Sequence, residues 1–186
     1  LKSIKFILDS VGFKIINIEL NNVNGGSFAV TAAKKKSKHE EQKKIINWLL
    51  KKEEISNFNK FETIKEFGVK AATQKILLKD LLNNLTDMGK TVYGYGASTK
   101  GNVILQYCNI NQDDLPFVCD VNPYKFNKYT PGTKIKIISE EKAKKINPDY
   151  FLVLPWHFRD FIIKKEKKYI NSGRNLIFPL PDIEII

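Results

Sequence analysis

The sequence predicts an α/β fold in which a doubly wound parallel sheet of about five strands follows a helical region. Two observations lead to this prediction. From Lys90 onward, short apolar segments alternate with amphipathic segments, which is the pattern of repeated strand–helix units. Within that region Tyr150–Leu154 is apolar throughout, as expected of a strand whose two faces are both covered by helices.

The N-terminal segment has a different pattern. Apolar residues at helical spacing predict a helix over residues 2–12, which Gly12 ends. Alternating segments then predict strands at Phe13–Leu20 and Ser27–Ala33, joined by a turn at Asn21–Gly26. This unit is too small to bury a core alone. Because the chain also begins at Leu1 rather than at a methionine, we expect a processed product or a fragment, with these residues ending a larger domain.

Helical patterns dominate the next region. A basic connector at Lys34–Lys38 precedes a helix over Glu40–Glu54. Aromatic and aliphatic residues between Phe58 and Phe67 continue a second helical stretch, which we expect to break at Gly68. Leucines at helical spacing predict a further amphipathic helix over residues 70–88.

The strand–helix alternation supplies the remaining elements. The expected strands are Thr91–Tyr95, Pro116–Asp120, Ile135–Ile138, Tyr150–Leu154, Asn175–Phe178 and, at the edge, Ile183–Ile186. The expected helices are Thr99–Cys108, a helix from Ser139 to Lys145, and residues 157–171. We therefore divide the chain into a terminal helix and hairpin at 1–38, a helical connector at 39–89 and an α/β domain at 90–186.

Composition excludes several classes of protein. No stretch approaches the roughly 20 apolar residues of a membrane helix, and no signal peptide is evident, so we expect a cytoplasmic protein with no membrane partner. The net charge is +11, but only Arg159 and Arg174 of the 31 basic residues are arginines. Since arginine is preferred for phosphate and base contacts, we do not expect nucleic acid as a partner. Cys108 and Cys119 lack metal-ligand spacing and are expected to be buried thiols.

One glycine-rich turn is the main candidate for a binding site. Gly94 and Gly96 allow a sharp turn after the strand, and Ser98 and Thr99 are good caps for the following helix. The start of a helix attracts phosphate, and Lys100 adds a positive charge there. The spacing G-x-G-x-x-x-x-G is neither the dinucleotide fingerprint nor a P-loop. A tight turn without a ligand therefore remains an alternative.

Other candidate residues follow the later strands. Asp120 stands where an acid would hold a ribose hydroxyl, although an aspartate there could equally form a turn. Lys125 could pair with a phosphate or be a solvated lysine. Trp156 could stack on a base or sugar, or pack in the core. His157 at a helix start is expected to face solvent. The sequence contains no nucleophile–base arrangement and no metal cluster, so it favours holding a phosphorylated ligand over doing chemistry on it.

Four segments together resemble the C-terminal domain of the sugar-nucleotide C-methyltransferases. They are Gly94–Asn102, Asp120–Lys125, Tyr129–Thr133 and Leu154–Trp156. Asn24-Gly25-Gly26-Ser27 also resembles the Gly-Gly-Ser turn between the last two strands of the S-adenosylmethionine-dependent domain in this family. The resemblance covers essentially the whole chain.

The resemblance implies that different domains bind the cofactor and the substrate. A zinc-binding segment and the methyltransferase fold precede a Rossmann-like C-terminal domain that helps to hold a nucleotide-linked deoxysugar. The cofactor loop, the zinc cysteines and the acid/base residues of the family lie before Leu1. We therefore expect S-adenosylmethionine to bind the full-length enzyme outside this chain, with no cofactor or metal bound by the chain itself. The expected partners are the nucleotide-linked sugar and the preceding methyltransferase domain.

No position is nominated as catalytic, and the substrate-binding residues follow from the matching segments. They are Gly94, Gly96, Ala97, Ser98, Thr99, Lys100, Gly101, Asn102, Asp120, Lys125 and Trp156. Two departures from the family concern the hairpin: Asn24 stands where a histidine is common, and Ala29 replaces a later arginine. These changes weaken the expectation of substrate contacts there.

Three functions are consistent with these observations. The first is the substrate-binding C-terminal portion of a methyltransferase for nucleotide sugars, inactive by itself. The second is a dinucleotide-binding domain of an oxidoreductase, against which the glycine spacing argues. The third is a non-catalytic interaction module with a purely structural glycine turn.

Overall fold

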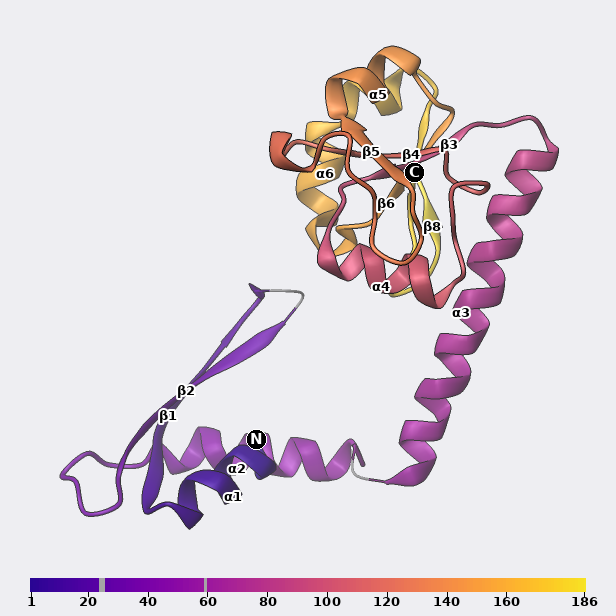
Figure 1. The fold of residues 1–186 in the computed structure, drawn as a ribbon. Coiled ribbons are helices and arrows are strands. Elements are labelled where there is room, and N and C mark those ends of the chain that lie inside the picture. The colour runs from indigo at the N-terminus through magenta and orange to yellow at the C-terminus, as the bar shows by residue number, and fades with distance from the viewer. Residues whose placement is uncertain (24–25, 59) are drawn as a thin grey trace. The chain divides into compact units, whose positions relative to one another are not determined.

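The computed structural model describes residues 1–23, 26–58 and 60–186 (Figure 1). The chain divides into two compact units, Leu1–Gly68 and Val69–Ile186. The expected boundaries at residues 38 and 89 remain a prediction. Asn24 and Gly25 lie outside the described residues, and with them the centre of the expected turn and of the Gly-Gly-Ser resemblance.

The first unit contains the predicted helix and hairpin. Its elements are α1 (Lys2–Ser10), β1 (Phe13–Asn21), β2 (Ser27–Lys34) and α2 (Lys43–Ile55). The strands β1 and β2 pair antiparallel in a sheet of their own, so the prediction that this hairpin stays outside the later sheet is confirmed. A small apolar cluster of Ile15, Ile18 and Ile46 packs the hairpin against α2.

The long helix α3 (Phe61–Asp87) corrects the expected break at Gly68. A glycine inside a helix costs only about 1 kcal/mol relative to alanine, which is too little to end a helix by itself. Packing does not require a glycine at position 68 either, because a Cβ there would meet nothing within 4 Å. The helix ends instead at Asp87, and the φ of +72° at the following Gly89 allows the Lys90 N–H to bond the Leu85 carbonyl.

The second unit is built on a mostly parallel sheet. Within residues 69–186, which are all described, it has six strands in the order β5-β4-β3-β6-β7-β8. They are β3 (Val92–Tyr95), β4 (Phe117–Asp120), β5 (Lys136–Ser139), β6 (Tyr150–Val153), β7 (Asn175–Phe178) and β8 (Glu184–Ile185). The first five are parallel and β8 is an antiparallel edge strand. The predicted doubly wound, Rossmann-like sheet is therefore confirmed.

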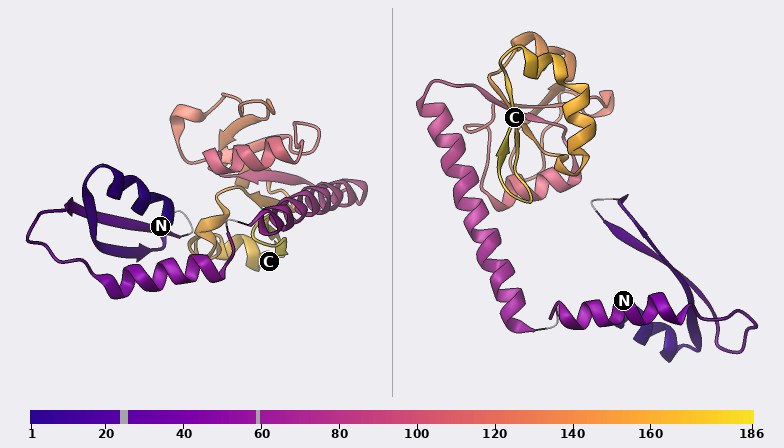
Figure 2. Two further views of the ribbon diagram at one scale, coloured as in Figure 1. Left: turned by 90° about the horizontal axis from the view of Figure 1, so that it is seen from below. Right: turned by 180° about the vertical axis from the view of Figure 1, so that it is seen from behind.

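Helices cover both faces of this sheet (Figure 2). The C-terminal half of α3 and α4 (Thr99–Tyr107) pack on one face, where Leu82, Leu105 and Leu152 share a cluster. The other face is covered by α5 (Glu140–Ile146), α6 (Arg159–Lys165) and α7 (Lys167–Asn171). The single helix expected over residues 157–171 is wrong. A 3-10 turn, η3 (Trp156–Phe158), precedes α6, and the helix is interrupted at Glu166.

The strand order locates the crevice where ligands bind in such folds. After β3 the chain adds β4 and β5 on one side, then crosses through α5 to place β6 on the other side of β3. Ligands of doubly wound sheets bind beyond the carboxyl ends of the strands at this reversal. Here the reversal lies between the loop after β3, which begins at Gly96, and the loop after β6, which begins at Leu154.

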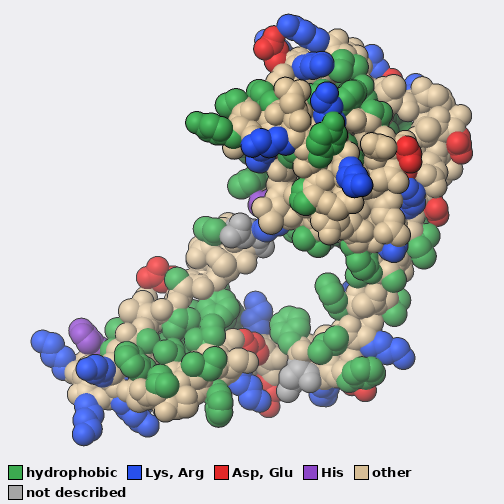
Figure 3. Space-filling model, in the orientation of Figure 1, with side chains coloured by type: hydrophobic (Ala, Val, Ile, Leu, Met, Phe, Trp, Pro, Cys, Tyr) green, Lys and Arg blue, Asp and Glu red, His purple; other side chains and the backbone are tan. Residues whose placement is uncertain are grey.

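Among the described residues, no helix is long and apolar enough to cross a bilayer. On the face of the second unit seen in Figure 3, lysine and arginine side chains are scattered among apolar and acidic ones.

Candidate functional site

The glycine turn has the predicted strand–turn–helix conformation. Gly96 has a φ of +80°, the left-handed region in which glycine is favoured. Ser98 is the N-cap of α4, and its Oγ accepts the Gly101 N–H at 3.0 Å. The Asn102 N–H donates to the Ser98 carbonyl at 3.0 Å and begins the helical ladder. Thr99, the first residue of α4, is exposed at the start of the helix.

Three glycines of this region are required by close packing. A Cβ on Gly94 would lie 2.6 Å from Val118 Cγ2, and one on Gly96 would lie 2.7 Å from the Pro155 ring. A Cβ on Gly101 would lie 2.5 Å from Leu154 Cβ. Contacts below 3.0 Å force the backbone or a neighbour to move. The glycines therefore have structural reasons to be present, and the case for a ligand depends on the neighbouring groups.

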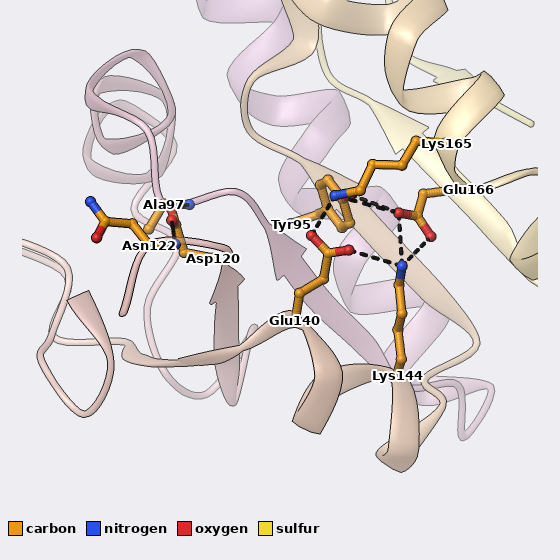
Figure 4. A network of polar contacts seen from close by, with 8 residues as sticks. All are labelled: Tyr95, Ala97, Asp120, Asn122, Glu140, Lys144, Lys165 and Glu166. Carbon is orange, nitrogen blue, oxygen red and sulfur yellow. Dashed lines mark hydrogen bonds and ion pairs between the residues drawn. The ribbon is translucent and has the colours of Figure 1, made fainter. Parts of the chain in front are cut away.

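Asp120 connects the turn to the next strand. It is only 8% exposed, and its carboxylate accepts the N–H groups of Ala97 at 2.9 Å and Asn122 at 2.8 Å (Figure 4). The Lys125 Nζ lies 2.9 Å from the same carboxylate and donates to the Ala97 carbonyl at 2.9 Å. Asp120 thus binds the N–H of Ala97, and Lys125 binds its carbonyl.

These hydrogen bonds change what we expect of Asp120 and Ala97. The Asp120 carboxylate, expected to meet a ribose hydroxyl, already has three donors from the protein. The Ala97 N–H, expected to face a phosphate, is occupied by Asp120. Both residues therefore position the turn in this structure, and their contact with a ligand remains a prediction.

The side chains of Lys100, at the start of α4, and Trp156, in the loop after β6, lie close together. The Lys100 Nζ lies 5.9 Å from the centre of the Trp156 ring, within the range of a cation–π contact. Trp156 is half-buried and packs against the apolar clusters on both faces of the sheet. Trp156 therefore packs in the core, which was one of its two expected roles, and it also lies close to Lys100.

Two polar atoms near this crevice are buried without a hydrogen-bond partner among the described residues. They are the Asn102 Oδ1 and the His157 Nδ1. Burial, and then the positive charge of Lys100, lower the pKa of His157, which favours a neutral imidazole at neutral pH. His157 is partly buried rather than solvent-facing, so that expectation is wrong.

These groups can bind an anion. A helix leaves the N–H groups of its first turn unused within the helix, and the positive end of its dipole favours negative charge. In α4 this end lies beside the ammonium of Lys100 and opposite the loop after β6. Such an arrangement suits a phosphate group.

A second polar cluster was not foreseen from the sequence. Glu166 is only 2% exposed and accepts hydrogen bonds from the Tyr95 hydroxyl at 2.8 Å and from Lys144 at 2.9 Å (Figure 4). Lys165 donates to the Tyr95 hydroxyl at 2.8 Å and to Glu140 at 2.6 Å. Burial, and then the hydrogen bond to the Glu166 carboxylate, strongly raise the pKa of Tyr95. The tyrosine therefore stays protonated, and the cluster joins α5 and α6 to β3.

Cys108 and Cys119 are buried free thiols, as predicted, and burial raises the pKa of Cys119 to about 12. Within residues 1–23, 26–58 and 60–186, no group of three or more histidine, cysteine, aspartate or glutamate side chains could hold a metal ion.

Comparison with known proteins defines the class to which this fold and crevice belong. Residues 22–181 match the C-methyltransferase C-terminal domain family, so the chain belongs to that family. It is similar to C-methyltransferase NovU of Streptomyces niveus, with 31% identity over all 186 residues. These residues correspond to 44% of the length of NovU, so the chain spans less than half of that relative. The predicted family is therefore confirmed.

Proposed function

We propose that this domain holds the nucleotide-linked sugar substrate of an S-adenosylmethionine-dependent C-methyltransferase. The observation that carries the proposal is the site at the strand reversal, in a chain of the C-methyltransferase C-terminal domain family. There the start of α4 and Lys100 face the loop that carries Trp156. The substrate's phosphates would meet the first turn of α4, with Ser98 holding that turn in place.

The same proposal assigns methyl transfer to residues outside this chain. It gives no residue of this chain a part in the transfer step. S-adenosylmethionine would bind a preceding methyltransferase domain, and the present chain alone would neither bind this cofactor appreciably nor transfer a methyl group. Titration calorimetry that gave micromolar affinity for S-adenosylmethionine would contradict this assignment.

The hydrogen bonds that Asp120 accepts within the protein argue against the oxidoreductase alternative. A dinucleotide-binding domain uses an acid near this position to hold the ribose hydroxyls. In this chain the carboxylate is 8% exposed and has three protein donors. Because Asp120 is buried and these donors surround its carboxylate, a ribose hydroxyl would have little access to it.

A thermal-shift panel tests the proposal. The intact chain is heated with a nucleoside diphosphate sugar, the free nucleoside diphosphate, NAD, NADP and S-adenosylmethionine. A ligand present at 100 times its dissociation constant stabilises the fold by about 2.7 kcal/mol. We expect stabilisation by the nucleoside diphosphate sugar and the free nucleotide only. Stabilisation by NAD instead would favour the oxidoreductase, and no stabilisation by any ligand would favour an interaction module.

A further inference from the structure

We propose that the ring of Tyr124 is a stacking platform for the base of the bound nucleotide. This inference rests on the proposed function and deepens it, since it assigns the part of the ligand that the first turn of α4 does not reach. Tyr124 is 82% exposed. It lies in the 3-10 turn η2 (Pro123–Lys125) directly after β4, at the carboxyl edge of the sheet.

The turn that carries Tyr124 is firmly held. Pro123 fixes the first position of η2, and the Asn122 Oδ1 accepts the Tyr124 N–H at 3.0 Å. The Asn122 N–H in turn donates to the buried Asp120 carboxylate at 2.8 Å. The Lys125 N–H donates to the Asn122 carbonyl at 3.0 Å. The backbone of such a turn loses little further freedom when the tyrosine binds a ligand.

The same turn is joined to the glycine turn. The Lys125 Nζ donates to the Ala97 carbonyl at 2.9 Å, while Asp120 accepts the Ala97 N–H. The residue next to Tyr124 therefore contacts the segment that leads into α4. Because β3 and β4 are adjacent parallel strands, both turns lie at one edge of the sheet, where a nucleotide bound by its phosphates would place its base.

The chemistry of the ring fits a base. A tyrosine ring offers a large apolar face with little conformational freedom to lose, and bases stack on such faces whatever their identity. Val121, at the start of the same loop, is also exposed, at 68%. Stacking of this kind would bind pyrimidine and purine nucleotides alike, and it would leave the choice of sugar to other residues.

Titration calorimetry on the intact chain tests the stacking role. The probes are uridine diphosphate, adenosine diphosphate and inorganic pyrophosphate, which has no base. We expect Tyr124→Ala to weaken binding of both nucleoside diphosphates about tenfold, within the range for base–aromatic stacking, and to leave the affinity for pyrophosphate unchanged. Tyr124→Phe keeps the ring and should bind as the unsubstituted chain does.

A matched control is Tyr107→Ala. Tyr107 is also exposed, but it lies at the far end of α4, about 12 Å along the helix from Thr99. Its removal should change no affinity. If Tyr124→Ala leaves both nucleoside diphosphate affinities unchanged, or weakens pyrophosphate equally, the stacking role is wrong while the phosphate site stands. If the unsubstituted chain binds none of the three probes, the proposed function fails together with this inference.

Discussion

Replacing Gly96 with alanine tests the geometry of the glycine turn. Gly96 has a φ of +80°, and a Cβ there would lie 2.7 Å from both Cγ and Cδ of Pro155. The left-handed conformation costs a non-glycine residue about 1–2 kcal/mol. Overpacking adds about 1–3 kcal/mol, because the closed proline ring cannot rotate away. We therefore expect Gly96→Ala to lower the free energy of unfolding by about 2–5 kcal/mol.

The matched control is Gly173→Ala. Gly173 has nearly the same φ, +83°, but a Cβ there would meet nothing within 4 Å. This variant should lose only the conformational part, about 1–2 kcal/mol. The difference between the two variants isolates the contact with Pro155.

Urea denaturation followed by tryptophan fluorescence measures both variants. A Trp48→Phe background leaves Trp156, beside the glycine turn, as the reporter of the second unit. The slope of unfolding free energy against urea should be the same for both variants, so that the midpoint reports stability. Equal losses for Gly96→Ala and Gly173→Ala would refute the argument that close packing against the loop after β6 requires a glycine.

Two further predictions concern the buried polar cluster. Glu166→Ala should lower the free energy of unfolding by about 2–4 kcal/mol in urea denaturation, because Tyr95 and Lys144 lose a buried acceptor. The control is Glu141→Ala, which removes an exposed ion pair and should leave the urea midpoint of unfolding unchanged. Although burial raises the pKa of Glu140, hydrogen bonds from lysines outweigh it and hold that pKa below the ordinary value of 4.5. A carboxyl with a lowered pKa stabilises the fold above its unfolded pKa and loses that contribution as the pH falls through the folded pKa. The Tm in scanning calorimetry should therefore fall as the pH drops below about 4.5, and less steeply in Glu140→Gln; equal slopes would contradict this account.

Much of the fold follows from local patterns in the sequence. The apolar strand Tyr150–Leu154, the cap at Ser139 and the glycine turn were all predicted, because each depends on residues close in the sequence. The continuity of α3 through Gly68 was not, because a single glycine costs a long helix little. The antiparallel pairing of β8 could not be predicted either, since it depends on contacts with a distant strand.

The relative positions of the candidate residues were more predictable than their contacts. Sequence order placed the segments at Gly96, Asp120 and Trp156 at one sheet edge, and the fold brings them together there. The partners of Asp120 could not be foreseen, because an aspartate after a strand can serve a ligand or a neighbouring loop equally well. Glu166 was missed because it stands in the run Lys164–Lys168, which has the composition of a solvated helix face. Its burial depends on packing against β3, which no local signal reports.

The central claim is that the start of α4 meets the phosphates of a nucleotide-linked sugar, and the affinity of Lys100→Ala tests it most directly. Calorimetric titration of the intact chain with a nucleoside diphosphate hexose should show binding that this variant weakens by about 1–3 kcal/mol, the value of a charge-assisted hydrogen bond. Lys90→Ala, at the opposite end of β3, should bind as the unsubstituted chain does. Unchanged affinity in Lys100→Ala, with binding to the unsubstituted chain demonstrated, would contradict the account and place the ligand elsewhere.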